Sequence, residues 1–147
     1  MILWRCGRRS GGAGHLCALR LNDVQRIDLA FFIAPFALYA LNQQIKYQVE
    51  APVIGYLLRC HFNDYLGGIA FAAYLNLVIS FSKWPARRLK KPLHFAAAGI
   101  LCGLFWEWIA PMFLPHSTGD WLDVVAYVLG MLTYWAMWGR KSDGAYT

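Results

Sequence analysis

Four stretches of this chain contain almost no charged residues, and they limit its fold more than any other feature of the sequence. They are residues 29–41, 65–81, 93–111 and 121–138. A helix needs about 20 mainly apolar residues to cross a bilayer. The last three stretches approach that length, and the first reaches it only as a tilted helix extended by Ile27 and residues 42–45. The pattern therefore predicts four transmembrane helices, the first of them kinked at Pro35.

The composition agrees with a membrane protein. Hydrophobic residues make up 59% of the 147 residues and charged residues only 15%, against roughly 45–50% and about 25% in soluble domains. A soluble domain of this size has too much surface to cover so many apolar side chains. We therefore predict an all-α fold, a polytopic membrane bundle of four transmembrane helices.

The remaining segments divide the chain into three parts. Residues 1–23 are basic and glycine-rich and lack the apolar core of a signal peptide, so we expect a mobile amino-terminal segment. Residues 24–138 form the transmembrane domain, and residues 139–147 form a polar tail. Within the domain, residues 51–58 are apolar but too few to cross the bilayer, which predicts a short interfacial or re-entrant helix.

The basic residues predict the orientation in the membrane. They gather before the first helix, in the connector of residues 82–92 and in the tail, whereas only Lys46 and Arg59 fall on the other side. Because Lys and Arg are enriched in cytoplasmic loops, we expect both termini and the connector to face the cytoplasm, with the chain in the plasma (inner) membrane. The net charge of +6 is thus explained by orientation, and no nucleic-acid partner is predicted.

The sequence contains no recognisable catalytic motif. A GxSxG elbow, a phosphate-binding glycine loop and an HExxH pair are all missing. The four cysteines show neither CxxC nor Cys/His ligand spacing, so neither a zinc site nor a disulfide framework is predicted from them. We predict no catalytic residues and no organic cofactor, and an enzyme is the less favoured interpretation.

The acidic residues are the most informative polar feature. Asp64, Glu107, Asp120 and Asp123 all map to the outer half of the predicted bundle. Ionisable groups inside a span are costly and usually functional. Glu107 follows Gly99 and Gly103 at intervals of four, and small residues at this spacing allow close helix contact. Glu107 shares their face and should point into the bundle.

The last two acids begin a single helical stripe. The stripe consists of Asp120, Asp123, Tyr127, Gly130 and Tyr134. Asp120 could be only an N-cap, but Asp123 lies inside the apolar run. Asp64 begins the second long run, where Gly68, Ala72 and Asn76 mark another packing face. An N-cap is an alternative for Asp64 as well.

These residues predict an outward-facing acidic pocket. Its ligand-binding residues would be Glu107, Asp120, Asp123, Asp64, Tyr127 and Arg59. Either Arg59 or His61 could pair with an acid, because unpaired clustered carboxylates repel one another. A divalent cation could bridge the carboxylates. The expected ligand is cationic or hydroxyl-rich, such as a lipid headgroup, a cell-wall precursor or a glycopeptide.

Two other functions fit the same residues. Intramembrane acids also serve as proton relays, so the chain could be a small proton- or ion-coupled transporter acting as a homo-oligomer. The acids could instead fix helix packing in a structural or assembly subunit. In both cases membrane lipids remain the immediate partners.

Residues 60–138 resemble the VanZ-like membrane proteins of bacteria. The resemblance rests on the segment HFNDYLGGIAFAAYLN, on Glu107, and on Asp120 and Asp123 followed by Tyr127 and Gly130. The family often carries a Gln one turn after the Glu and an Asn in the last helix; here residues 109–112 contain no Gln, and Tyr127 replaces the Asn. The resemblance implies a multi-pass envelope protein, in some members linked to resistance to the antibiotic teicoplanin.

Overall fold

The computed structural model describes residues 21–109, 112–113 and 120–141. Most of the expected amino-terminal segment, most of the polar tail and most of the loop before Asp120 therefore lie outside the described residues. Within the described ranges the ordered elements are all helical, which confirms the predicted fold class.

Four helices are long and apolar enough to cross a membrane. The elements are α1 (Asp23–Ile45), α2 (Pro52–Cys60), α3 (Phe62–Phe81), the short 3-10 turn η1 (Pro85–Arg87), α4 (Pro92–Leu104), the π-turn η2 (Phe105–Ile109), α5 (Trp121–Tyr134) and the π-turn η4 (Trp135–Gly139). Each π-turn continues the helix before it, and α2 is the predicted short helix. The chain is therefore a multi-pass membrane protein.

Helix α1 is longer than its apolar run. It begins at a capping box, in which the Asn22 side chain accepts a hydrogen bond from the Gln25 backbone N–H (2.8 Å) and the Gln25 side chain accepts one from Asn22 (3.0 Å). Such reciprocal bonds satisfy two backbone donors that a helix start leaves open. Pro35 lies inside the helix without ending it.

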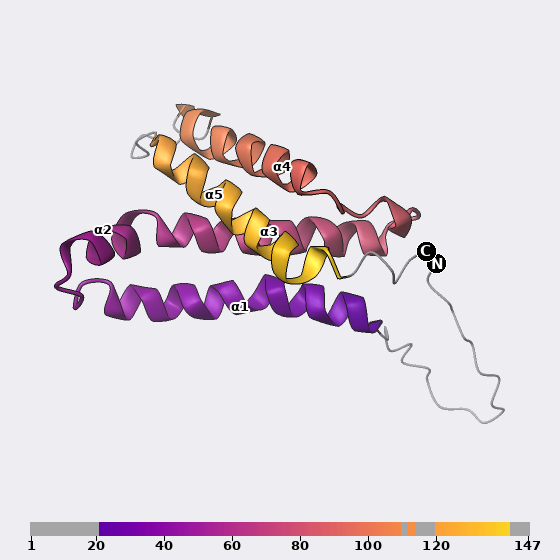
Figure 1. Ribbon diagram of the computed structural model, residues 1–147, viewed down its shortest axis with the longest axis horizontal. Coiled ribbons are helices and arrows are strands. Elements are labelled where there is room, and N and C mark those ends of the chain that lie inside the picture. The colour runs from indigo at the N-terminus through magenta and orange to yellow at the C-terminus, as the bar shows by residue number, and fades with distance from the viewer. Residues whose placement is uncertain (1–20, 110–111, 114–119, 142–147) are drawn as a thin grey trace, which may run out of the picture.

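The four long helices lie in the order α1, α3, α5, α4 (Figure 1). Glycines set the close approaches between them. A Cβ atom on Gly130 of α5 would lie 2.1 Å from the Tyr65 carbonyl oxygen of α3, and one on Gly99 of α4 would lie 2.8 Å from Val128 Cα of α5. The predicted packing faces are therefore confirmed, and the backbones touch where only glycine fits.

The outer surface of the bundle is largely apolar, and its buried residues include both apolar and polar side chains. In α1 the buried residues are Gln25, Asp28, Pro35 and Asn42, while Phe36 is 56% exposed. An apolar surface of this extent marks a membrane environment. The hydrophobic core is small and centres on Phe95, Met131 and Tyr134 with two alanines of α3.

One end of the bundle is held by a buried ion pair, which we call the Asp28 cluster: Asp28, Ser80, Arg88, Tyr134 and Trp138. Arg88 donates to the Asp28 carboxylate at 2.5 and 3.1 Å and to Ser80 Oγ at 2.7 Å. Tyr134 and Trp138 donate to Asp28 Oδ1 at 2.7 and 2.8 Å. Arg88 is one of the basic residues of the connector that predicted the orientation, and its side chain is buried because it pairs with Asp28 within the bundle.

Asn76 fastens the same connector to α3. Its side chain accepts from the Leu89 N–H (2.8 Å) and donates to the Leu89 carbonyl and to the Tyr134 hydroxyl (both 3.3 Å). This pairing satisfies both ends of a fully buried amide. The connector is thus part of the folded bundle.

Candidate acidic site

The predicted acids meet at the opposite end from the Asp28 cluster, where α3 begins, α4 ends and α5 begins (Figure 1). Asp64 lies in the first turn of α3, Glu107 in the π-turn that extends α4, and Asp123 in the first turn of α5. Antiparallel spans place these helix ends together although they are far apart in the chain. The structure therefore gathers the acidic residues that the sequence analysis grouped.

Asp120 and Glu107 together shape the start of α5. Asp120 is the N-cap, and its Oδ1 accepts a hydrogen bond from the Leu122 N–H at 2.9 Å. Glu107 Oε2 accepts from the Asp120 backbone N–H at 2.7 Å. Both carboxylates thus lie at the positive end of the α5 dipole and accept hydrogen bonds from the backbone N–H groups there. The N-cap alternative for Asp120 is confirmed.

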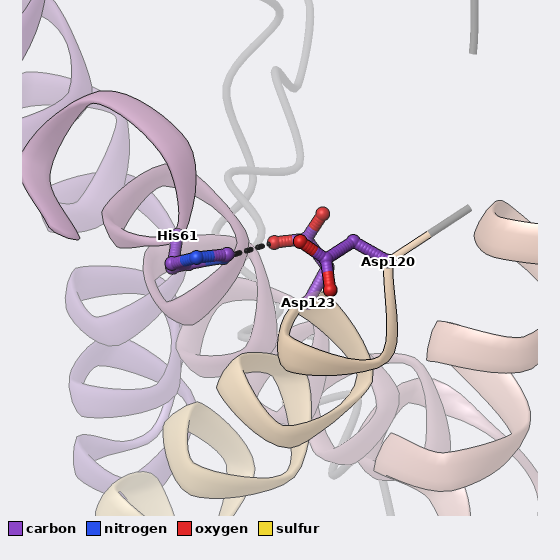
Figure 2. A group of neighbouring side chains, drawn as sticks. All are labelled: His61, Asp120 and Asp123. Atoms are coloured by element: carbon purple, nitrogen blue, oxygen red, sulfur yellow. Dashed lines mark hydrogen bonds and ion pairs between the residues drawn. The ribbon is translucent and has the colours of Figure 1, made fainter. Parts of the chain in front are cut away.

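Asp123 forms the strongest polar contact of the site. Its Oδ1 lies 2.6 Å from His61 Nδ1, and the two side chains are 18% and 8% exposed. A carboxylate oxygen only accepts, so Nδ1 donates. Figure 2 shows the imidazole directed at the Asp120 and Asp123 carboxylates. Of the two side chains considered, His61 is therefore the one that pairs with an acid.

His61 owes its position to the break between α2 and α3. Its backbone N–H closes the last turn of α2 on Leu57, while its carbonyl accepts from the Tyr65 N–H in α3 (both 3.0 Å). One residue thus ends one helix and begins the next, and its side chain turns inward. The Tyr56 ring contacts the imidazole edge to face at 5.2 Å.

Asp64 and Tyr127 complete the group. Asp64 interacts with the Tyr127 hydroxyl and with the Asp123 and Glu107 carboxylates. Tyr127 lies about one helical turn after Asp123 on the predicted stripe, so both side chains of α5 lie on the side that packs against α3. We call the whole group the acid cluster; its members are His61, Asp64, Glu107, Asp120, Asp123 and Tyr127.

The structure does not bring Arg59 to the acid cluster. Its guanidinium donates to the carbonyl oxygens of Lys46 (3.2 Å) and Val49 (3.4 Å), which follow α1. Arg59 lies two residues before the α2–α3 break and points away from α5 for that reason. The sequence analysis considered His61 as an alternative but did not include it in the site. The signal available was its position three residues before Asp64, on the same helical face.

A small open pocket leads into the cluster. It is lined by Glu107, Trp108, Asp120, Trp121 and Val124, and its volume is only about 20 Å³. The Trp108 and Trp121 rings meet edge to face, with centroids 4.5 Å apart. Aromatic faces beside carboxylates suit a cation, because the ring quadrupole attracts positive charge.

No protein-family model, no curated protein and no solved structure matches this chain. The chemistry of the acid cluster itself therefore indicates what it can do. The described residues of this cluster supply four carboxylates and one imidazole, so the site carries more acceptors than donors. Such a site favours a ligand that brings positive charge or hydrogen-bond donors.

Proposed function

We propose that this protein is a VanZ-like membrane protein of the cell envelope whose acid cluster binds a cationic or hydroxyl-rich ligand. A lipid headgroup, a cell-wall precursor and a glycopeptide have this chemistry. The observation that carries the proposal is the convergence of Asp64, Glu107 and Asp123 from three different helices.

Electrostatics supports a cationic ligand. Like charges that approach within a few ångströms repel strongly where water is scarce. The single imidazole bonds to Asp123 and leaves the other carboxylates without it as a partner. A bound cation would relieve the repulsion between the carboxylates, and it could also form a cation–π contact with the ring of Trp108 or Trp121.

Ligand binding is favoured over proton-coupled transport within one copy of the chain. A relay would have to join the acid cluster to Asp28, the acid of the other end. Asp28 already accepts from Arg88, Tyr134 and Trp138. Between the two clusters, the backbones of α3 and α5 touch at Gly68 and Gly130, where even an added methyl group would overlap its neighbours.

The binding test uses the full chain purified in an uncharged detergent, with spermidine as a cationic probe. Trp108 and Trp121 line the pocket, so their fluorescence should change saturably on binding. We expect Asp64→Asn and Asp123→Asn each to weaken binding at least about 10-fold, because a charged hydrogen bond is worth about 1.5–3 kcal/mol. Asp23→Asn, an exposed acid at the other end, is the matched control. Unaltered binding by Asp123→Asn would refute the proposal.

The orientation needs a separate experiment. Reporters of both compartments fused after Ser117 and after the carboxy terminus should place Ser117 outside and the terminus in the cytoplasm, as the basic residues predict. A cytoplasmic signal at Ser117 would turn the acid cluster inward, and an external cell-wall or antibiotic ligand would then have no access to it.

A further inference from the structure

We propose that His61, Asp120 and Asp123 form a binding site for a divalent transition-metal ion. This inference rests on the proposed function, since it names the cation that the acid cluster would take. Each residue offers one ligand atom, and the three atoms all lie within 4.8 Å of one another. They come from two separate parts of the fold, the α2–α3 break and the start of α5.

The histidine distinguishes this group from a plain acidic patch. The His61 side chain is only 8% exposed, and its Nδ1 faces the Asp123 carboxylate at 2.6 Å, so Nδ1 is the atom that would bind the ion. The ring is held against Tyr56 and directed at the Asp120 and Asp123 carboxylates (Figure 2). The fold thus aims a metal-binding side chain at two carboxylates.

The distances suit a metal after a small adjustment. Bonds of about 2.1 Å at tetrahedral angles place neighbouring ligand atoms roughly 3.4 Å apart. His61 Nδ1 and Asp123 Oδ1 are now 2.6 Å apart, joined by a proton. Exchanging that proton for a metal ion would part them by roughly 0.8 Å. Asp120 has two oxygens, so it can keep its bond to the Leu122 N–H while it binds the ion.

The ligand set selects the class of metal. Calcium and magnesium prefer sites made wholly of oxygen, whereas imidazole suits zinc and its neighbours in the first transition row. Three protein ligands also leave a fourth position open. A hydroxyl group of a bound ligand could occupy that position, next to Asp64.

The test measures Co²⁺ binding by the full chain in detergent after chelator treatment. Bound Co²⁺ should give visible d–d absorption, and Zn²⁺ should displace it while Mg²⁺ should not. We expect His61→Gln and Asp120→Asn each to weaken Co²⁺ binding at least about 10-fold, because even groups that only hydrogen-bond to a ligand contribute roughly 10- to 100-fold. Asn remains a good N-cap, so Asp120→Asn should keep the fold. Glu50→Gln, an exposed acid, is the matched control.

The outcomes separate this inference from the proposed function. Loss of Co²⁺ binding in His61→Gln, with spermidine binding retained, supports the metal site. Equal Co²⁺ affinity in wild type and both variants, or equal competition by Mg²⁺, overturns it. Spermidine binding without Co²⁺ binding overturns the metal site alone, whereas absence of both overturns the proposed function as well.

Discussion

Replacing Asp28 with Asn should destabilise the bundle more than any other loss of one charge. Asp28 is fully buried, and it accepts hydrogen bonds from Arg88, Tyr134 and Trp138. The Asn amide has the same shape as the Asp28 carboxylate but carries no charge, and its NH₂ group would face one of these three donors instead of accepting from it. Arg88, whose side chain is 2% exposed, would then be a buried cation without its counter-charge.

The expected loss is large. Removing one partner of a buried ion pair costs about 3–5 kcal/mol. For a chain of this size each kcal/mol lowers Tm by about 2–4 °C. The Tm of Asp28→Asn should therefore fall by roughly 6–20 °C. Thermal unfolding in detergent, followed by tryptophan fluorescence, measures this change directly.

Two further variants test the reasoning. Asp23→Asn is the control, because Asp23 and Arg26 form an exposed pair, with side chains 95% and 60% accessible, and such pairs contribute little. The double variant Asp28→Asn with Arg88→Gln removes both charges, so its Tm should exceed the value expected from adding the two single losses. A shift below about 2 °C for Asp28→Asn, or strict additivity in the double variant, would refute the argument.

Three other changes test the packing. Gly99→Ala should lower Tm, because the new methyl group would lie 2.8 Å from an α5 backbone atom and such overpacking costs about 1–3 kcal/mol. Ala97→Ser, on the exposed face of α4, is the control and should leave Tm unchanged. Asn76→Ala should speed tryptic cleavage of the connector, because Leu89 loses both of its bonds to α3; an unchanged rate would contradict this. Tyr134→Phe should lose about 1.5–3 kcal/mol of unfolding free energy in denaturant titration, the value of a hydrogen bond to a charged group.

The spans were predictable because lipid demands long apolar segments, and the expected extension of the first span to residue 45 is confirmed, but its start at Asp23 was not predicted. Hydropathy treats Gln25, Asp28 and Asn42 as interruptions, yet all three lie in α1 and face the bundle interior. The partners of Asp28 and Asn42 come from other helices and from the connector, and no local pattern reveals them. The apolar run therefore underestimates a helix whose buried side is polar.

The acid cluster was predictable to a similar extent. Alternation of the spans brings Asp64, Glu107 and Asp123 to one end, and the stripe on α5 adds Tyr127. The choice between Arg59 and His61 was open, because it depends on how the chain turns between α2 and α3. The sequence also left open which basic residue of the connector pairs with Asp28, because the connector contains several neighbouring Lys and Arg residues that the sequence does not distinguish.

The Asp28 cluster has a consequence for the order in which the protein is made. Arg88 follows Asp28 by 60 residues and Tyr134 follows it by 106. A ribosome that adds about 5–20 residues per second delivers Arg88 roughly 3–12 s after Asp28, and Tyr134 later still. During that interval the first span has no counter-charge for its carboxylate, so it must wait near the water interface or within the insertion machinery. The first helix made is therefore among the last to reach its final position.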